Sequence, residues 1–361
     1  GGGRRYGAEV ARGRGVPDLN CEKLVVGRTS RERKKLEKLL EQGQQSGVPG
    51  LSLIGREEIR ELEPNVNAEY ALRSQGTSVV LPYLFAIALA ENASLNGVHV
   101  ELNAEVTGMS KLSLSGMLEL TTSDERSFAC SVVINAAGLN SDRVAALVEH
   151  PNESIHPWRG EYHLLSEESS SIVSRAVYPV PPDTGGGLGV HLTPTVNGGV
   201  LLGPSADPIE DRWDTSNDSS VLDTLKDEAF ELVPKLAHIP VIKNYAGVRP
   251  KLFGADSGIR FRDFVIEPSA TTRGLINLHG IESPGLTAAP AIASLVVTRI
   301  IPDLLTLRPK REWSYKRTTI PRVRFLDRYT LRDLTTRNAE FGCIECHCEQ
   351  VSRAEIAMAL R

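Results

Sequence analysis

Three segments of the chain place apolar residues at the spacing of amphipathic helices. The first covers residues 29–47, where Ser30 can cap the N-terminus and charged residues fill the outer face. Its inner face carries Leu36, Leu39 and Leu40. The second covers residues 52–63 and ends at Pro64, which cannot continue a helix, and the third covers residues 82–95.

Short runs of alternating or continuous apolar residues predict strands elsewhere. In the first half these runs are residues 98–102, 105–109, 118–121 and 128–135. After residue 155 the runs are separated by glycine and proline, at residues 160–165, 176–180, 189–195, 200–204, 245–251 and 264–268, with one helix at 219–233. This change of pattern predicts an α/β fold with a second domain inserted between two parts of the α/β domain. The inserted domain would be a substrate or cap domain with a mixed or antiparallel sheet.

The composition narrows the class of protein. A chain of 361 residues with 41% hydrophobic and 24% charged residues is a globular protein with room for two or three domains. The formal net charge of −4 and the lack of a basic stripe argue against nucleic acid as a partner. No apolar run reaches the roughly 20 residues of a membrane span, and no apolar signal region follows the first residues. We expect a cytoplasmic location, with attachment to a membrane surface as the alternative.

Two segments have the pattern of a strand followed by a glycine-rich turn and a helix. In the first, the apolar residues 275–278 precede a loop bracketed by Gly280 and Gly285, and a helix is predicted over 288–300. In the second, the strand ending at Asn135 is followed by small residues and a helix that starts near Ser141. A helix N-terminus at the carboxyl end of a strand can bind an anion or a cofactor. Ordinary βα connections and tight strand-helix packing explain the same patterns without a ligand.

Five motifs, taken together and in this order, resemble the D-amino-acid-oxidase-like superfamily of FAD-dependent oxidoreductases. They are Asn135-Ala-Ala-Gly-Leu139, Arg159-Gly-Glu-Tyr-His-Leu-Leu165, Val190-His-Leu-Thr-Pro194 with Val200-Leu-Leu-Gly-Pro204, Gly247-Val-Arg-Pro-Lys251 and Gly280-Ile-Glu-Ser-Pro-Gly-Leu-Thr287. The resemblance covers roughly residues 15–300 and is closest to the L-2-hydroxyglutarate dehydrogenase/oxidase branch. It implies a Rossmann-type FAD domain and a substrate domain with a mixed sheet.

The resemblance also implies which residues lie along FAD. The strand residue Val106 would meet the adenine through its backbone, and the loop after the second strand would lie along the cofactor with Ala136, Ala137 and Gly138. The pyrimidine edge of the isoalloxazine would be approached by Gly280, Ile281, Glu282, Ser283, Gly285, Leu286 and Thr287. The helix dipole behind this loop would stabilise negative charge on the reduced ring.

The chemistry implied is transfer of a hydride from the C–H group of a 2-hydroxy acid to flavin, while a base takes the hydroxyl proton. A carboxylate calls for a bidentate partner, so Arg249 or Arg159 is the candidate. The candidate bases are His191 and His163 on alternating strands, and His279 before the glycine loop. Tyr162 could bind the substrate through its hydroxyl, although each of these side chains could equally be a packed, hydrogen-bonded core residue.

Three other functions stay open at this stage. Glycerol 3-phosphate would require two or more cations converging in the pocket, whereas a hydroxy diacid would need one arginine for each carboxylate. An amine substrate is the second alternative. A non-catalytic binding subunit or fragment is the third, and copurified flavin would exclude it. For an enzyme the expected partners are the small substrate and an electron acceptor such as a quinone, oxygen or a redox protein.

The sequence departs from the family pattern at its start. The family opens with a strand and a Gly-x-Gly-x-x-Gly turn that holds the FAD pyrophosphate. The segment Gly1-Gly-Gly-Arg-Arg-Tyr-Gly7 has no strand before it, and Gly185-Gly-Gly-Leu-Gly189 has the wrong spacing. We therefore expect the chain to enter the pattern after the first βαβ unit, which leaves the FAD domain incomplete.

The second departure is a cysteine cluster near the end of the chain, where Cys343, Cys346 and Cys348 lie within six residues. It resembles the start of a bacterioferritin-associated-ferredoxin-like [2Fe-2S] domain, in which the pair matching Cys346 and Cys348 needs a second pair further along the chain. Four thiolates are the usual requirement, so this sequence contains half a site, with Cys343 as a possible extra ligand. Zinc and three reduced thiols without a metal are the alternatives.

The predicted domain limits follow from these assignments. Residues 1–150 form a partial FAD domain that includes part of the substrate domain at 28–75, and residues 151–270 form the substrate domain. The remaining parts are the rest of the FAD domain at 271–302, a linker at 303–340 and a truncated [2Fe-2S]-like segment at 341–361.

Overall fold

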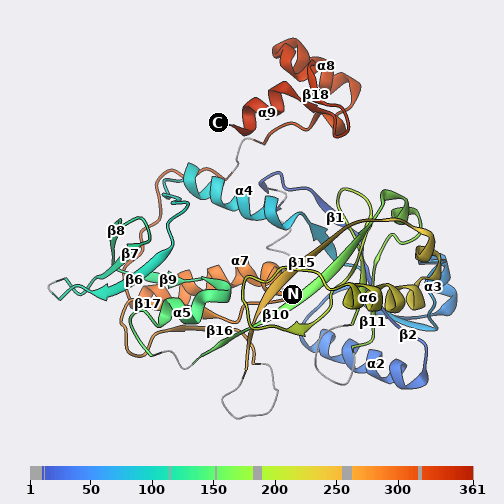
Figure 1. The fold of residues 1–361 in the computed structure, drawn as a ribbon, viewed down its shortest axis with the longest axis horizontal. Helices are drawn as coiled ribbons and strands as arrows, with labels where there is room; N and C mark the ends of the chain where they lie inside the picture. The colour runs from blue at the N-terminus through green and yellow to red at the C-terminus, as the bar shows by residue number, and fades with distance from the viewer. Residues whose placement is uncertain are drawn as a thin grey trace.

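The largest element of the fold is a nine-stranded mixed sheet, seen in the right half of Figure 1. The computed structural model describes residues 10–11, 13–113, 115–150, 153–181, 189–253, 262–315 and 319–360. The strands of the sheet are β2 (Lys23–Gly27), β3 (Leu51–Gly55), β4 (Tyr70–Ser74), β10 (Ile155–Leu165), β11 (Ala176–Pro179), β12 (His191–Pro194), β13 (Val200–Gly203), β14 (Asp207–Pro208) and β15 (Val241–Leu252). Their order is β14-β10-β13-β12-β11-β2-β4-β3, with β15 on the other edge of β10, and only β11 and β2 pair in parallel.

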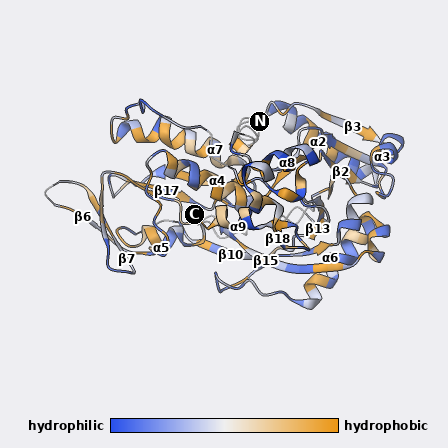
Figure 2. Cartoon of the chain, turned by 90° about the horizontal axis from the view of Figure 1, so that it is seen from above, coloured by the Kyte–Doolittle hydropathy of each residue, from blue (hydrophilic) through white to orange (hydrophobic). Residues whose placement is uncertain are grey.

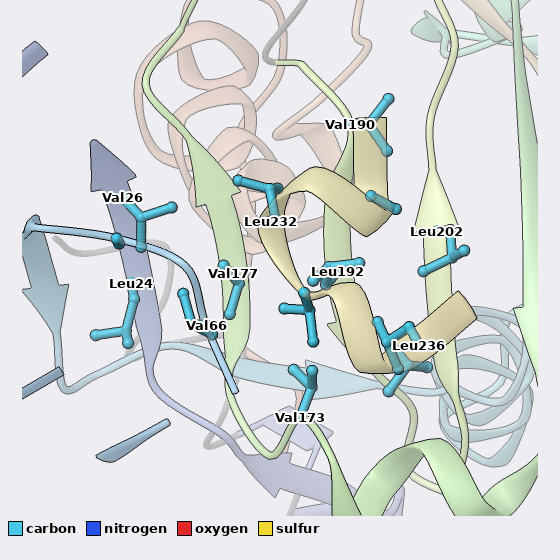
Figure 3. Packing of buried hydrophobic residues seen from close by; sticks show 14 of the residues in the cluster. Leu24, Val26, Val66, Val173, Val177, Val190, Leu192, Leu202, Leu232 and Leu236 are labelled. Carbon is cyan, nitrogen blue, oxygen red and sulfur yellow. The ribbon is translucent and has the colours of Figure 1, made fainter. Parts of the chain in front are cut away.

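One face of this sheet is covered by the main hydrophobic core. Leu24, Val177, Leu192 and Leu202 point from neighbouring strands toward α6 (Ser219–Leu232) and the turn that follows it, as Figure 3 shows. The helix α3 (Arg56–Leu62) completes this layer. Because side chains alternate along a strand, the neighbours of these core residues face the opposite side of the sheet.

The helix α2 (Ser30–Gln45) covers one end of that opposite side. Leu36 is buried against β2, β3 and β4, and Leu39 and Leu40 pack beside it, as the leucine spacing predicts. The cap is Thr29 rather than Ser30: its hydroxyl accepts a hydrogen bond from the N–H of Glu32, and the Glu32 carboxylate accepts one from the N–H of Thr29. The rest of this face lies outside the area that α2 covers and carries the candidate site described below, so we call it the substrate side.

A second, smaller layer lies in the left half of Figure 1. Its central strand β17 (Leu275–His279) pairs in parallel with β9 (Val133–Asn135) and antiparallel with β16 (Val265–Pro268). The helix α7 (Gly285–Leu295) packs on β17 through Ile292. The other elements of this part are α4 (Pro82–Leu95), the three-stranded meander β6 (Val106–Lys111), β7 (Leu118–Thr122) and β8 (Ser127–Cys130), and the short helix α5 (Ser141–Ala145). The strands β1 (Asp18–Asn20) and β5 (Ser78–Val80) form a separate two-stranded sheet, and β1 lies in the right half of Figure 1.

A small module with its own core follows, at the top of Figure 1. It contains α8 (Arg328–Arg337), the two-stranded sheet β18 (Ile344–Cys346) and β19 (Val351–Ser352), and α9 (Arg353–Ala359). Val323, Phe341 and Ala354 form its buried centre. Because α8 lies within residues 303–340, this range is not the continuous linker that its arginines and prolines suggested.

Three other predictions of local structure were wrong. Residues 51–55 form β3 instead of the start of a helix, because they pair with β4. Residues 98–102 are not a strand, and Val98, Val100 and Leu102 are exposed. The apolar run 128–135 is split into β8 and β9, which belong to different sheets. For β3 and β9, pairing with another strand overrode the local pattern, whereas residues 98–102 pair with no described strand.

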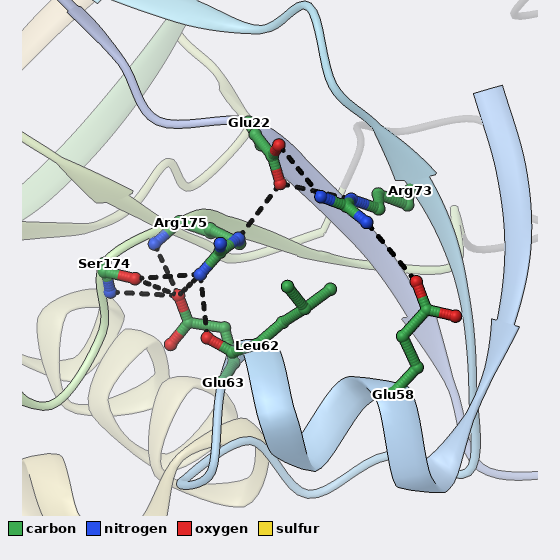
Figure 4. Close-up of polar contacts among 7 residues, drawn as sticks. All are labelled: Glu22, Glu58, Leu62, Glu63, Arg73, Ser174 and Arg175. Atoms are coloured by element: carbon green, nitrogen blue, oxygen red, sulfur yellow. Dashed lines mark hydrogen bonds and ion pairs between the residues drawn. The ribbon is translucent and has the colours of Figure 1, made fainter. Parts of the chain in front are cut away.

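A buried carboxylate joins α3 to β11. Glu63 is 1% exposed and accepts hydrogen bonds from the Ser174 hydroxyl at 2.6 Å and the Arg175 N–H at 2.7 Å, as Figure 4 shows. The Arg175 guanidinium then bonds to Glu22 at 3.1 Å, and Glu22 also binds Arg73 at 3.0 Å. This network occupies the Glu22 carboxylate, which matters for its neighbour Lys23.

Candidate functional site

A row of side chains crosses the uncovered face of the large sheet in register. Tyr178 of β11 is opposite His191 of β12, which is opposite Gly203 of β13. Gly203 is next to Tyr162 of β10, and Tyr162 is opposite Tyr245 of β15. Gly203 has a φ of 140°, and a Cβ atom there would lie 2.6 Å from the carbonyl oxygen of Glu161, so only glycine fits. The row therefore consists of two aromatic pairs, and Gly203, which has no side chain, lies between them.

His191 forms one of these pairs with Tyr178. The two rings stack with centroids 3.8 Å apart and an angle of 10° between their planes. His191 is 9% exposed, and its Nδ1 atom is buried without a hydrogen-bond partner. Burial, together with the cations Lys23 and Arg249, lowers the pKa of His191 to about 3. The imidazole is therefore neutral at physiological pH and can accept a proton.

Arg249 lies beside the second aromatic pair, Tyr162 and Tyr245, whose rings stack at 5.0 Å. Its Nη2 atom donates a hydrogen bond to the carbonyl oxygen of Ser205 at 2.8 Å. To reach Ser205 the side chain crosses β10 over Gly160, where a Cβ atom would lie only 2.1 Å from Nη2. The missing side chain of Gly160 therefore allows Arg249 to approach His191.

The other two candidates for acid-base or carboxylate-binding roles, His163 and Arg159, lie on the opposite face of the sheet. His163 is fully bonded within the core, at 2.7 Å to the Asn244 side chain and 2.8 Å to the carbonyl oxygen of Leu222. Arg159 forms ion pairs with Glu161 at 3.1 Å and Asp214 at 2.7 Å. The reason is the period of two along β10, which places residues 159, 161 and 163 on the α6 side and residue 162 on the side of His191.

His279 lies at the carboxyl end of β17. Its Nδ1 atom is 2.9 Å from the hydroxyl of Ser141, and burial lowers the pKa of the imidazole. This contact holds the start of α5 against β17, so His279 has a structural explanation.

The two predicted cofactor loops lie next to each other. Asn135 and Asn277 are opposite residues of β9 and β17, and their side chains are hydrogen-bonded at 2.9 Å. Ala136, Ala137 and Gly138 follow β9, and the residues from Gly280 to Thr287 follow β17, so both loops leave the same edge of the sheet. An ion pair of 2.9 Å between Lys251 of β15 and Glu282 joins the second loop to the substrate side. Val106 begins β6, in the meander that packs on β9 and β17 through Met109.

The residues of these loops fit the ring end of a flavin. Gly138 has a φ of 54° and open space around its Cα, and the Oδ1 atom of Asn140 is buried without a partner. The helix α7 has no side-chain cap, and the N–H of its first residue, Gly285, donates to the carbonyl oxygen of Glu282. The positive end of the helix dipole would stabilise negative charge placed beside this turn.

The phosphate end of the cofactor has no such seat in the described residues. They contain no strand that leads through Gly-x-Gly-x-x-Gly into a helix, and the two glycine-rich segments, residues 1–7 and 185–188, lie outside them. Among the described strands, β9 pairs only with β17. In β9, Val133 and Asn135 are buried, but Ile134 between them is 44% exposed. One edge of β9 and the side chain of Ile134 are therefore left uncovered by the described residues.

The helices α4 and α7 carry many hydrophobic residues, drawn orange in Figure 2, and several of these residues are exposed. The exposed large side chains are Tyr83, Ile87, Leu89 and Leu95 on α4 and Leu286 and Leu295 on α7. Within the described ranges, Gly285–Asp303 is the one helical stretch long and apolar enough to cross a membrane by length and composition. Ile292 and Val296 nevertheless pack against β17, as in a core helix.

Lys23, Tyr178 and Tyr245 belong to this site but were not singled out from the sequence. The available signal was a lysine at the start of an otherwise apolar run, Lys23-Leu-Val-Val26. The two tyrosines carried no local signal, because only the strand pairing places them beside His191 and Tyr162.

The C-terminal cysteines are only partly brought together. The sulfurs of Cys346 and Cys348 are 3.1 Å apart, and the hydrogen bond between them lowers the pKa of Cys346. Cys343 contacts the carbonyl oxygen of Ala339 instead. In the part of the chain that the structure describes, no group of three or more His, Cys, Asp or Glu side chains is arranged to hold a metal ion.

Comparison with known proteins gives consistent matches. The family model described as FAD dependent oxidoreductase matches residues 3–299. A glycerol 3-phosphate dehydrogenase of Caloramator mitchellensis is 33% identical over 98% of this chain and 71% of its own length. The human mitochondrial L-2-hydroxyglutarate dehydrogenase is 27% identical, and the match covers 81% of this chain and 73% of that protein's own length. The structure of L-α-glycerophosphate oxidase from Mycoplasma pneumoniae with FAD bound superposes with a TM-score of 0.76 at 27% identity, covering 87% of this chain and 83% of that one.

Proposed function

Because the chain belongs to the FAD-dependent oxidoreductase family, we propose that it oxidises the CH–OH group of a small 2-hydroxy acid similar to L-2-hydroxyglutarate. The observation that carries this proposal is a neutral, buried His191 with an unpartnered ring nitrogen, flanked by an arginine on the same face of the sheet. When bound, FAD supplies the chemistry of hydride acceptance.

The side chains of this chain would share the remaining work. Arg249 binds the carboxylate next to the carbinol carbon, and His191 takes the hydroxyl proton on a ring nitrogen. Burial raises the pKa of Tyr162, which therefore stays protonated and can donate a hydrogen bond to the substrate. Gly203 leaves space for the carbinol group between His191 and Tyr162.

Binding of the substrate would also make His191 a stronger base. Lys23 and Arg249 disfavour a positive imidazole in the free protein. A negative charge placed on these cations offsets their effect on the ring. Substrate binding would therefore raise the pKa of His191, while burial, the largest cause of its low value, would still act on the ring.

Glycerol 3-phosphate is the second candidate substrate. Two cations, Lys23 and Arg249, lie near His191, which is the number of cations expected for a phosphate, although they approach the ring from different sides. The 33% identical relative is a glycerol 3-phosphate dehydrogenase, and its match extends over 98% of this chain. An amine substrate has less support, since no carboxylate faces His191 in the described structure.

Flavin content and substrate-dependent reduction test the proposal. The purified chain is analysed for bound FAD after denaturation, and the flavin-loaded protein is then mixed anaerobically with L-2-hydroxyglutarate, sn-glycerol 3-phosphate or an amine. Bleaching of the flavin absorbance by L-2-hydroxyglutarate supports the first candidate. Bleaching by glycerol 3-phosphate alone selects the second, and absence of flavin under all loading conditions favours a non-catalytic binding subunit.

Gly160→Ala is expected to raise KM for the substrate by about 10- to 100-fold, because a Cβ atom at this position displaces the Arg249 guanidinium. Steady-state kinetics of the flavin-loaded protein measures the effect. The matched control is Gly247→Ala on the opposing strand, since Gly247 has no atom within 4 Å of an added Cβ. Equal changes in the two variants would contradict the proposed path of Arg249.

We also propose that the C-terminal module contributes thiolates to a [2Fe-2S] cluster that passes electrons onward. Cys346 and Cys348 already lie in contact, and Cys343 is the possible extra ligand, whereas a cluster usually requires four thiolates. Anaerobic reconstitution with iron and sulfide, followed by absorption and electron paramagnetic resonance spectra, tests this role. Stoichiometric zinc without iron would support the alternative site.

The electron acceptor and the location of the protein stay predictions. A quinone, oxygen or a redox protein could serve as acceptor, and a cytoplasmic or membrane-surface location fits the sequence. Reoxidation rates of the reduced protein with each acceptor and fractionation of cells measure these two properties.

A further inference from the structure

Lys23 occupies an unusual position on the substrate side of the sheet. The residues after it, Leu24 and Val26, alternate into the core with Val25 between them, so Lys23 faces the side of His191. Its ammonium lies over the ring of Tyr178, 5.1 Å from the centroid. Tyr178 in turn stacks on His191. Lys23 therefore borders the site in which His191 would act.

The charge of Lys23 has no carboxylate partner among the described residues. The neighbouring Glu22 is bound to Arg73 and Arg175, at 3.0 and 3.1 Å. Burial lowers the pKa of Lys23, which reflects the cost of holding a cation away from water. The contact with the Tyr178 ring offsets part of this cost, and an anion bound beside the ammonium would offset the rest.

Lys23 and Arg249 approach His191 from opposite sides. Lys23 comes with Tyr178, whereas Arg249 comes with Tyr162 beyond Gly203. Two separated cations suit a ligand whose two negative charges are on different groups. A single phosphate would place both charges at one end of the substrate.

Extending the proposed function, on which this step depends, we propose that Lys23 binds the second carboxylate of the substrate and so selects dicarboxylic over monocarboxylic 2-hydroxy acids. Arg249 holds the carboxylate next to the reacting carbon, and Lys23 holds the distal one. The chain between the two carboxylates then crosses the space over Gly203, with the reacting carbon beside His191.

The kinetic test compares L-2-hydroxyglutarate with L-2-hydroxybutyrate, which lacks the distal carboxylate, in the flavin-loaded protein. Lys23→Met is expected to raise KM for L-2-hydroxyglutarate by about 10- to 100-fold, the loss of one charge-assisted hydrogen bond. The KM for L-2-hydroxybutyrate should change less than about threefold, because this substrate has no group for Lys23 to bind. The value of kcat is not a readout of this role, because Lys23 also lowers the pKa of His191. Lys23→Arg should restore most of the affinity, because it restores the charge.

A binding measurement separates this proposal from the proposed function. Glutarate is expected to raise the melting temperature of the 361-residue protein, butyrate is not, and Lys23→Met should remove the difference. The change in melting temperature tests the role of Lys23 even if no hydroxy acid reduces the flavin. A failure of flavin reduction would overturn only the proposed function. Methionine has a similar length and no charge to bury, so the variant is expected to fold, as circular dichroism can verify.

Three outcomes would overturn the assignment of Lys23. The first is an equal loss with both hydroxy acids, since Lys23 would then act on the shared part of the substrate. The second is a glutarate effect that Lys23→Met leaves intact. The third is a loss confined to glycerol 3-phosphate or inorganic phosphate, which would make the ligand a phosphate.

Discussion

Arg249→Met is expected to lower kcat/KM for L-2-hydroxyglutarate by about 100- to 1,000-fold in the flavin-loaded protein. Removing one partner of a desolvated charge pair costs about 2–5 kcal/mol, and much of this cost is the unpaired charge that remains. In this site the remaining charge would be the substrate carboxylate, beside the stacked rings of Tyr162 and Tyr245. Steady-state kinetics across a range of substrate concentrations measures the loss.

Two further variants test whether the loss of kcat/KM in Arg249→Met comes from substrate binding by the guanidinium. Arg249→Lys keeps the charge but not the two-pronged guanidinium, so we expect it to recover only part of the activity. Arg56→Met is the matched control, because Arg56 forms an exposed ion pair with Glu69 on the far side of the sheet. If Arg249→Met folds and turns over substrate at an unchanged rate, Arg249 does not bind the substrate.

His191→Gln is expected to lower kcat by about 100- to 10,000-fold, the usual contribution of a general base. Glutamine preserves a polar side chain of similar length but cannot take a proton at this pH. Stopped-flow measurement of flavin reduction isolates this step from product release.

The same variant is expected to change the acid side of the stability profile. The pKa of His191 is about 3 in the folded protein and about 6.5 in the unfolded chain. Below pH 6.5 the unfolded chain takes up a proton that the folded protein does not. This one proton lowers the free energy of unfolding by about 1.4 kcal/mol for each pH unit between pH 6.5 and about 3, and has no effect above pH 6.5. His191→Gln removes this contribution, so its urea-unfolding free energies should fall less steeply with pH than those of the natural protein.

His163→Gln separates the two histidines that the sequence could not distinguish. His163 is bonded through both ring nitrogens on the α6 side of the sheet. Its replacement should reduce stability, because a buried partner is lost, while kcat changes little. A larger loss of kcat in His163→Gln than in His191→Gln would reverse the assignment of the base.

Much of the scaffold could be predicted because its signals are local. The helix over residues 82–95 begins and ends as predicted, since a proline at its first position and an apolar run determine it without outside contacts. The two glycine loops follow short apolar strands, as their sequences indicate, because glycine is needed where the backbone has a positive φ, as at Gly138 and Gly280. Pairing errors arose where the partner was distant, as for β3 and for the split between β8 and β9.

The sequence alone predicted several of the helices and strands, the two glycine loops and, through five motifs in a fixed order, the family. The tertiary structure placed the two loops next to each other, because β9 and β17 pair in parallel. The tertiary structure decided which of its histidines and arginines share a face, and it added Lys23, Tyr178 and Tyr245 to the site. The physical reason is that successive strand residues point to opposite sides, so a side chain's neighbours depend on the register between strands. The row from Tyr178 to Tyr245 joins segments almost 70 residues apart, and Lys23 reaches it through the parallel pairing of β2 with β11.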